Sequence, residues 1–92
     1  SSLANEFQLF ENYPNPFNPS TTISYALHKP EFVNLKIYSL LGEELQQVVS
    51  EYQPAGLHTV KFDASDFAGG IYFYTLQVGT AFSDTKKMVL MK

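Results

Sequence analysis

Apolar and polar residues alternate along most of this 92-residue chain, in short runs separated by turn residues. Such alternation is typical of half-buried strands, and turn signals at intervals of about 8–12 residues are typical of an antiparallel sandwich or barrel. We therefore predict an all-β fold of two packed antiparallel sheets. The seven expected strands cover residues 6–10, 22–28, 33–38, 45–50, 57–62, 71–78 and 82–91.

Three of these runs also predict which side chains face the core, because side chains at every second position of a strand share a face. The segment 45–50 is ambiguous, since its pattern also fits the start of a helix. Its short length and the turn at Gly42 favour a strand. The expected inward rows are Ile23, Tyr25 and Leu27; Val33, Leu35 and Ile37; and His58, Val60 and Phe62.

Three prolines fall within residues 14–19. Each proline removes a backbone donor and holds the preceding residue in an extended conformation. The segment is therefore neither helix nor central strand. We expect an extended arm that runs over a sheet edge and is anchored by the side chains of Tyr13 and Phe17.

Composition excludes several function classes. Without cysteine the chain forms no disulfide and offers no thiolate or Cys-ligated zinc. Without arginine, and with six basic against nine acidic residues, it has little support for nucleic-acid binding. No apolar run is long enough for a transmembrane segment. Charge is uneven, however, because residues 81–92 carry three lysines and one aspartate on an otherwise acidic chain.

The sequence offers little for catalysis. His28 and His58 lie in no catalytic or zinc motif, so we interpret both as strand-edge residues. Asp63 and Asp66 form the best acidic pair and are weak candidates for a calcium site. We favour the alternative that both carboxylates bond to backbone N–H groups in a turn. We expect no enzymatic activity and no cofactor.

Aromatic residues raise the alternative of a carbohydrate-binding or adhesive module. The chain has six tyrosines and eight phenylalanines, although tryptophan is absent. Each of these side chains also suits core or sheet-edge packing. The candidate stacking residues are Tyr13, Phe17, Phe32, Tyr52, Phe73 and Phe82.

Several segments, taken in order over residues 7–92, together resemble the type IX secretion C-terminal sorting domains. The first and last segments are the most specific. The opening signature comprises Asn12, Tyr13, Pro14, Asn15, Pro16, Phe17, Asn18 and Pro19. The middle segments contribute Gly42, Gly56, Gly70, Tyr72 and Tyr74, and the closing segment contains Lys86, Lys87, Met88, Val89, Leu90 and Lys92.

The resemblance implies an immunoglobulin-like sandwich that follows an N-terminal cargo domain in the same chain. It implies recognition by an outer-membrane secretion apparatus after transit through the periplasm. It also implies removal by a sortase-like protease, with the cargo secreted or attached at the outer-membrane surface. We expect residues 1–6 to be a linker and residues 7–92 to form one domain. The immunoglobulin-like domain of flagellar hook-capping proteins is the nearest structural alternative.

The closing strand is the expected recognition element. Its two side-chain rows, one led by Lys86 and the other by Lys87, should lie on opposite faces. Lysines on an edge strand discourage pairing with stray strands, so they can be merely solubilising. Alternatively, a transporter can pair its own strand with this edge. We expect Tyr72 to form a tyrosine corner, with its hydroxyl bonded to upstream backbone.

Overall fold

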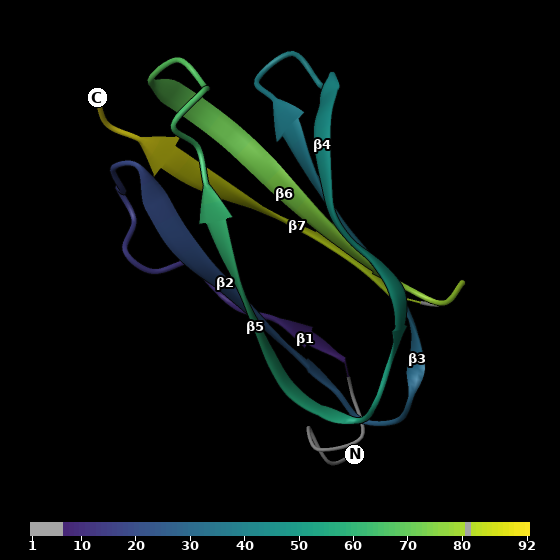
Figure 1. Ribbon diagram of the computed structural model, residues 1–92. Coiled ribbons are helices and arrows are strands. Elements are labelled where there is room, and N and C mark those ends of the chain that lie inside the picture. Colours follow the sequence, from purple (N-terminus) through teal and green to yellow (C-terminus); the bar gives the residue numbers. More distant parts are fainter. Residues whose placement is uncertain (1–6, 81) are drawn as a thin grey trace.

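The computed structural model describes residues 7–80 and 82–92. Two antiparallel sheets face each other, as Figure 1 shows. The part of the chain that is described contains seven strands and no helix, so the predicted all-β sandwich is confirmed. The strands are β1 (Gln8–Leu9), β2 (Ser20–Leu27), β3 (Glu31–Ser39), β4 (Glu44–Gln53), β5 (Gly56–Asp63), β6 (Gly70–Val78) and β7 (Phe82–Leu90).

The strand order places the last strand at an edge. The three-stranded sheet has the order β1-β2-β5, and the four-stranded sheet has the order β4-β3-β6-β7. β3 and β6 occupy the centre of the larger sheet, whereas β4 and β7 are its edges. The arrangement is consistent with an immunoglobulin-like sandwich.

The core lies between the inner faces of the two sheets, where the predicted rows of β2 and β3 are almost completely buried. In β5, Phe62 is buried, and His58 and Val60 are partly buried on the same side. The inward rows are therefore confirmed. Burying each large apolar side chain contributes about 1.5–3 kcal/mol, which favours the register that points these rows inward.

The ambiguous segment is a strand, so the helical alternative is wrong. β4 runs from Glu44 to Gln53 and pairs with β3 along its length. The hairpin between them turns at Gly42, whose φ of 91° is unfavourable for residues with a Cβ. The turn therefore brings β4 back beside β3, where its backbone groups find partners.

The outer strands differ slightly from their predicted bounds. β1 is shorter than the predicted strand 6–10, and residue 6 lies outside the described residues. Phe10 nevertheless continues the pairing, because its N–H donates to the Ser24 carbonyl at 3.0 Å. β7 ends at Leu90, one residue before the predicted end.

The proline-rich segment crosses from the smaller sheet to the edge of β7 (Figure 1). Phe17 is 2% exposed and anchors it, as predicted. The prediction that Tyr13 is also a side-chain anchor is wrong, because that side chain is 80% exposed. Tyr13 is held through its backbone instead: its N–H and C=O both bond to Thr22 of β2, at 3.0 and 2.9 Å.

Candidate recognition surface

Residues 10–19, here called the arm, cover one half of the outer edge of β7. The Phe17 N–H donates to the Val89 carbonyl, and the Met91 N–H donates to the Phe17 carbonyl, both at 2.9 Å. Phe17 thus forms a short parallel bridge with the end of β7. The opening and closing segments of the sequence, which are more than sixty residues apart, meet at this edge.

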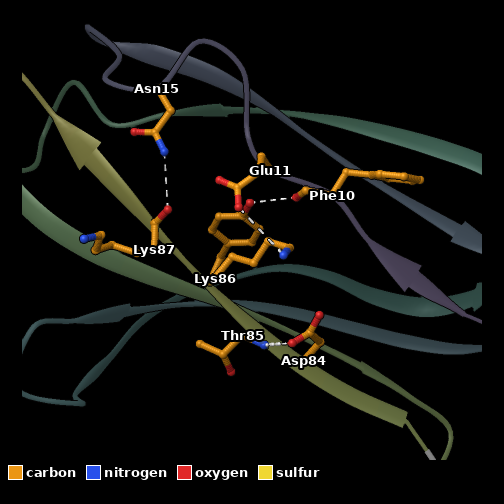
Figure 2. Close-up of polar contacts among 8 residues, drawn as sticks. Phe10, Glu11, Asn15, Asp84, Thr85, Lys86 and Lys87 are labelled. Carbon is orange, nitrogen blue, oxygen red and sulfur yellow. Dashed lines mark hydrogen bonds and ion pairs between the residues drawn. The ribbon is translucent and has the colours of Figure 1, made fainter.

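The Asn15 side chain extends this pairing in the manner of a peptide group. Its Oδ1 accepts the Val89 N–H at 3.0 Å, and its Nδ2 donates to the Lys87 carbonyl at 3.4 Å. Figure 2 shows the amide of Asn15 directed at Lys87. The arm therefore satisfies backbone groups of β7 that would otherwise be open at the edge.

A small polar network ties the start of the arm to β2. The buried Asn12 side chain donates from Nδ2 to Thr21 Oγ1 at 3.0 Å and to the Pro14 carbonyl at 3.2 Å. The Thr21 hydroxyl also donates to the Pro14 carbonyl, at 2.9 Å. At the other end, the Pro19 carbonyl accepts the Ala64 N–H at 2.8 Å. These bonds fix the path of the arm before it reaches β7.

Tyr74 supports the arm from the core. Its hydroxyl donates to the Phe10 carbonyl at 2.8 Å. Burial raises the pKa of Tyr74 to about 12, and the carboxylates of Glu11 and Asp84 act in the same direction. The neutral hydroxyl is therefore retained as a donor well above neutral pH.

The two side-chain rows of β7 have different surroundings. Met88 and Leu90 are buried in the inward row. Lys86 precedes them in the same row, and its Nζ lies 3.8 Å from Glu11 of the arm (Figure 2). In the outward row Lys87 is exposed and Val89 is partly exposed. Lys87 is thus the β7 lysine available on the outer face of the sheet.

Lys92 lies beyond the end of β7 and turns away from Lys87. Its Nζ donates to the Ser65 carbonyl at 2.7 Å. This contact connects the end of the chain to the loop between β5 and β6. The closing lysines therefore occupy three different environments.

The remaining signature residues shape turns. Gly42, Gly56 and Gly70 all have positive φ, and the last two begin β5 and β6. The Tyr72 hydroxyl donates to the Ala68 carbonyl, so the predicted bond from Tyr72 to upstream backbone is present. Asn18 is exposed at the far end of the arm.

The weak calcium candidates lie in the turn after β5. Asp63 Oδ1 accepts the Ser65 N–H at 2.9 Å and also the Ser65 hydroxyl. The hydrogen bond from the Ser65 hydroxyl lowers the pKa of Asp63 the most, and the bond from the Ser65 N–H lowers it further. Asp63 therefore has the turn role that we favoured, while Asp66 is exposed. Across residues 7–80 and 82–92 no three His, Asp or Glu side chains gather as a metal cluster.

The six aromatic candidates do not form one stacking row. Phe17 is buried, Phe82 is partly buried against the core, and Tyr13 lies on the arm. Phe32 faces Tyr52 across β3 and β4, whereas Phe73 faces Tyr38 at the opposite end of β3. Polar residues separate these two pairs along the sheet. A linear sugar-stacking platform is therefore not made by these side chains.

Two residues of this surface were not among the sequence-based candidates. Glu11 pairs with Lys86, and Asp84 points to the same inward side as Lys86. The signal for Asp84 is the alternation within 84–90, where Asp84 and Lys86 occupy the same row as Met88 and Leu90; this pattern does not point to Glu11. Choosing the apolar end of this row as inward would have placed both charges at the sheet interface.

Comparisons with known proteins agree with this architecture. The crystal structure of a β-glucosidase from Listeria innocua in complex with glucose matches with a TM-score of 0.57 and 13% sequence identity. The match covers 95% of this chain but 16% of that one, and at this identity it shows the fold alone. No curated protein sequence matches this chain.

The family comparison covers both the arm and β7. A family model described as the secretion system C-terminal sorting domain matches residues 11–91. This family comprises non-catalytic sorting signals of type IX secretion, and a domain of this kind implies a secreted or cell-surface protein. Because the match spans nearly all of the sequence, the chain belongs to the secretion system C-terminal sorting domains.

Proposed function

We propose that this chain is a non-catalytic module that directs an attached cargo protein through the outer membrane. The observation that carries the proposal is the contact between the arm and β7, which joins the two most specific signature segments into one surface. A receptor that binds this surface would distinguish the folded domain from other β-sandwiches. Sequence and structure thus support recognition of a folded surface.

Within this surface, β7 is the proposed recognition element. Lys87 presents its ammonium group on the outer face, while Lys86 is engaged by Glu11. The partly exposed Val89 lies beside Lys87 in the same row. A basic group next to an apolar one offers a partner both charge and contact area, which a purely solubilising edge does not require.

The proposed partners follow from family membership. The domain would bind the outer-membrane secretion apparatus after the cargo has entered the periplasm, and a sortase-like protease would then remove it. The cargo would precede residues 7–92, which we propose act as one domain, with residues 1–6 as the linker. The described residues contain no helix long and apolar enough to cross a membrane.

A fusion experiment tests the sorting role. We would place residues 1–92 behind a periplasmic carrier protein in a bacterium that has a type IX system. The carrier should reach the surface or the medium with the domain and remain in the periplasm without it. Equal delivery of the carrier with and without the domain would refute the proposal.

A further inference from the structure

One half of the outer edge of β7 is not covered by the arm. Val89 uses both backbone groups, and Lys87 its carbonyl, to bond to the arm. Because backbone groups of alternate residues point to the same side of a strand, the corresponding groups of Ser83 and Thr85 also face this edge. Among the described residues, the arm forms no backbone hydrogen bond with residues 83–86, and the outward backbone groups of Ser83 and Thr85 bond to no other segment.

A polar side chain occupies part of this open edge. The Thr85 N–H donates to Oδ1 of the neighbouring Asp84 at 2.9 Å (Figure 2). The contact lies between adjacent residues, so a rotation of the Asp84 side chain frees the donor. Edge strands with inward charges and locally capped donors resist indiscriminate pairing but can accept a partner that replaces the cap.

An apolar groove lies beside the open edge, on the outer face of the larger sheet. Its volume is about 360 Å³. Leu40 and Leu41, at the tip of the β3–β4 hairpin, are 61% and 95% exposed. Two apolar side chains at an exposed turn are unusual, and they indicate a contact surface. The groove is lined by Tyr38, Ser39, Leu40, Leu41, Gly42, Phe73, Thr75 and Thr85.

The strand register connects the groove to the edge. Thr85 lies opposite Thr75, and their hydroxyl groups are 2.8 Å apart. Lys87 lies opposite Phe73 in the next outward pair. Because both threonines are small, the groove is open toward the edge at Thr85. A strand added there would place one side chain beside Thr85 and the next on the same face beside Lys87.

We infer that residues 83–87 of β7 accept an extended peptide strand from a partner protein. The partner strand carries an acidic residue beside Lys87 and, two positions away, a large apolar residue that crosses Thr85 into the groove. Main-chain bonds to the open edge provide the attachment, and the charge and the groove provide the selectivity. The inference rests on the proposed function for the biological source of the strand, which is the secretion apparatus.

The opposite face of the partner strand has a different requirement. In the inward row, Asp84 and Lys86 occupy the positions that face the space between the sheets at this edge. An apolar side chain placed against these charges would desolvate them, so small polar residues fit best on that side. The recognised strand therefore carries small polar residues on its inward face, and an acidic and a large apolar residue on its outward face.

Binding of defined synthetic peptides tests the inference on the 92-residue chain. The probe is a capped peptide of sequence Thr-Thr-Glu-Thr-Phe-Thr-Thr, titrated into isotope-labelled protein while amide NMR shifts are recorded. Shifts should concentrate at residues 83–87 and at the hairpin tip 40–42. A peptide with Lys in place of Glu, and one whose edge-facing amides are N-methylated, should each bind at least about tenfold more weakly. Equal binding of the N-methylated peptide, or no binding by the probe, would overturn the inference.

Matched variants separate backbone pairing from side-chain contact. Thr85→Pro and Thr85→Val both lose the hydroxyl bond to Thr75. Thr85→Pro also removes the outward N–H, whereas Thr85→Val keeps it. We expect probe binding to be lost in Thr85→Pro and retained in Thr85→Val. If both variants bind equally well, a strand is not added at this edge. The N-methylated peptide gives the same test on unaltered protein if Thr85→Pro does not fold.

The groove has its own control. Leu41→Ser should weaken probe binding severalfold, whereas Leu57→Ser should not, because Leu57 is 68% exposed on the other sheet. Equal effects of the two variants would overturn the role of the groove.

Asp84→Ala removes the carboxylate that competes for the Thr85 N–H, so it should strengthen binding of the probe peptide. Weaker binding would contradict the proposal that the Asp84 side chain releases this N–H to the partner strand.

Secretion distinguishes failure of this inference from failure of the sorting role. Carriers fused to Thr85→Val should be delivered and those fused to Thr85→Pro retained. Delivery of both would overturn strand addition while leaving the sorting role intact. Delivery of the carrier without any domain would instead refute the sorting role.

Discussion

At the scale of single residues, the arm is held by polar groups whose partners are distant in the sequence. Asn15 bonds to β7, and Tyr74 bonds back to Phe10. Neither contact follows from local pattern, because alternation predicts which face a side chain occupies but not which backbone group it reaches. The signature segment was recognisable, while the role of Asn15 as a substitute peptide group required the three-dimensional arrangement.

Tyr74→Phe should lower the free energy of unfolding by about 1 kcal/mol at neutral pH, because the Phe10 carbonyl loses its donor. It should also change the pH dependence. Tyr74 has a pKa of about 12 in the folded chain. The tyrosine of an unfolded chain ionises at a pKa of about 10, so native stability should fall as pH rises between these two values.

Urea unfolding across this pH range measures both effects. Tyr74→Phe should show a smaller alkaline loss of stability than the unaltered chain. Tyr13→Phe serves as the control, because its hydroxyl is on a side chain that is 80% exposed. An identical alkaline profile for Tyr74→Phe and the unaltered chain would contradict the assigned role of Tyr74.

Asn15→Ala should loosen the end of β7 without disrupting the core. The substitution removes the acceptor of the Val89 N–H, so hydrogen exchange at that amide should accelerate, and stability should fall by about 1 kcal/mol. Asn18→Ala is the matched control, because Asn18 is exposed on the same arm. Unchanged hydrogen exchange at the Val89 N–H in Asn15→Ala would show that the Asn15 side chain does not protect the edge of β7.

At the scale of elements, the inward rows were predictable because period-two alternation coincides with the two faces of a strand. Ile23 and Val33 illustrate this, since both are completely buried. Tyr13 illustrates the limit: an aromatic side chain suggested an anchor, but backbone bonds to Thr22 hold the segment and leave the ring outside. Propensity does not reveal whether a residue is attached by its backbone or by its side chain.

The inward charge of β7 should also control association. Lys86→Ile would remove one of the two charged side chains of the inward row and the pairing with Glu11, so the edge would become more favourable for adding another strand. We expect concentration-dependent self-association in sedimentation velocity, with native stability maintained. Lys36→Ile, on the central strand β3, should associate less. Association of both variants to the same extent would indicate a general loss of charge rather than an edge effect.

At the scale of the whole molecule, positive charge is concentrated in the closing segment of an otherwise acidic chain. The closing twelve residues hold three of the six lysines, although the chain has a net charge of −3. Lys87 faces outward beside the arm, and Lys61 is exposed on β5 in the other sheet. A partner guided by this basic region must therefore approach the four-stranded sheet at its β7 edge.

The most direct test of this account compares Lys87→Glu with Lys61→Glu in the carrier fusion. Both substitutions change the net charge equally and replace an exposed lysine on a strand. With the unfolding free energies of both domains shown to be similar, cell fractionation measures the share of carrier at the surface and in the medium. We predict that Lys87→Glu leaves the carrier in the periplasm and that Lys61→Glu is delivered normally. Equal delivery of both fusions would contradict recognition through β7.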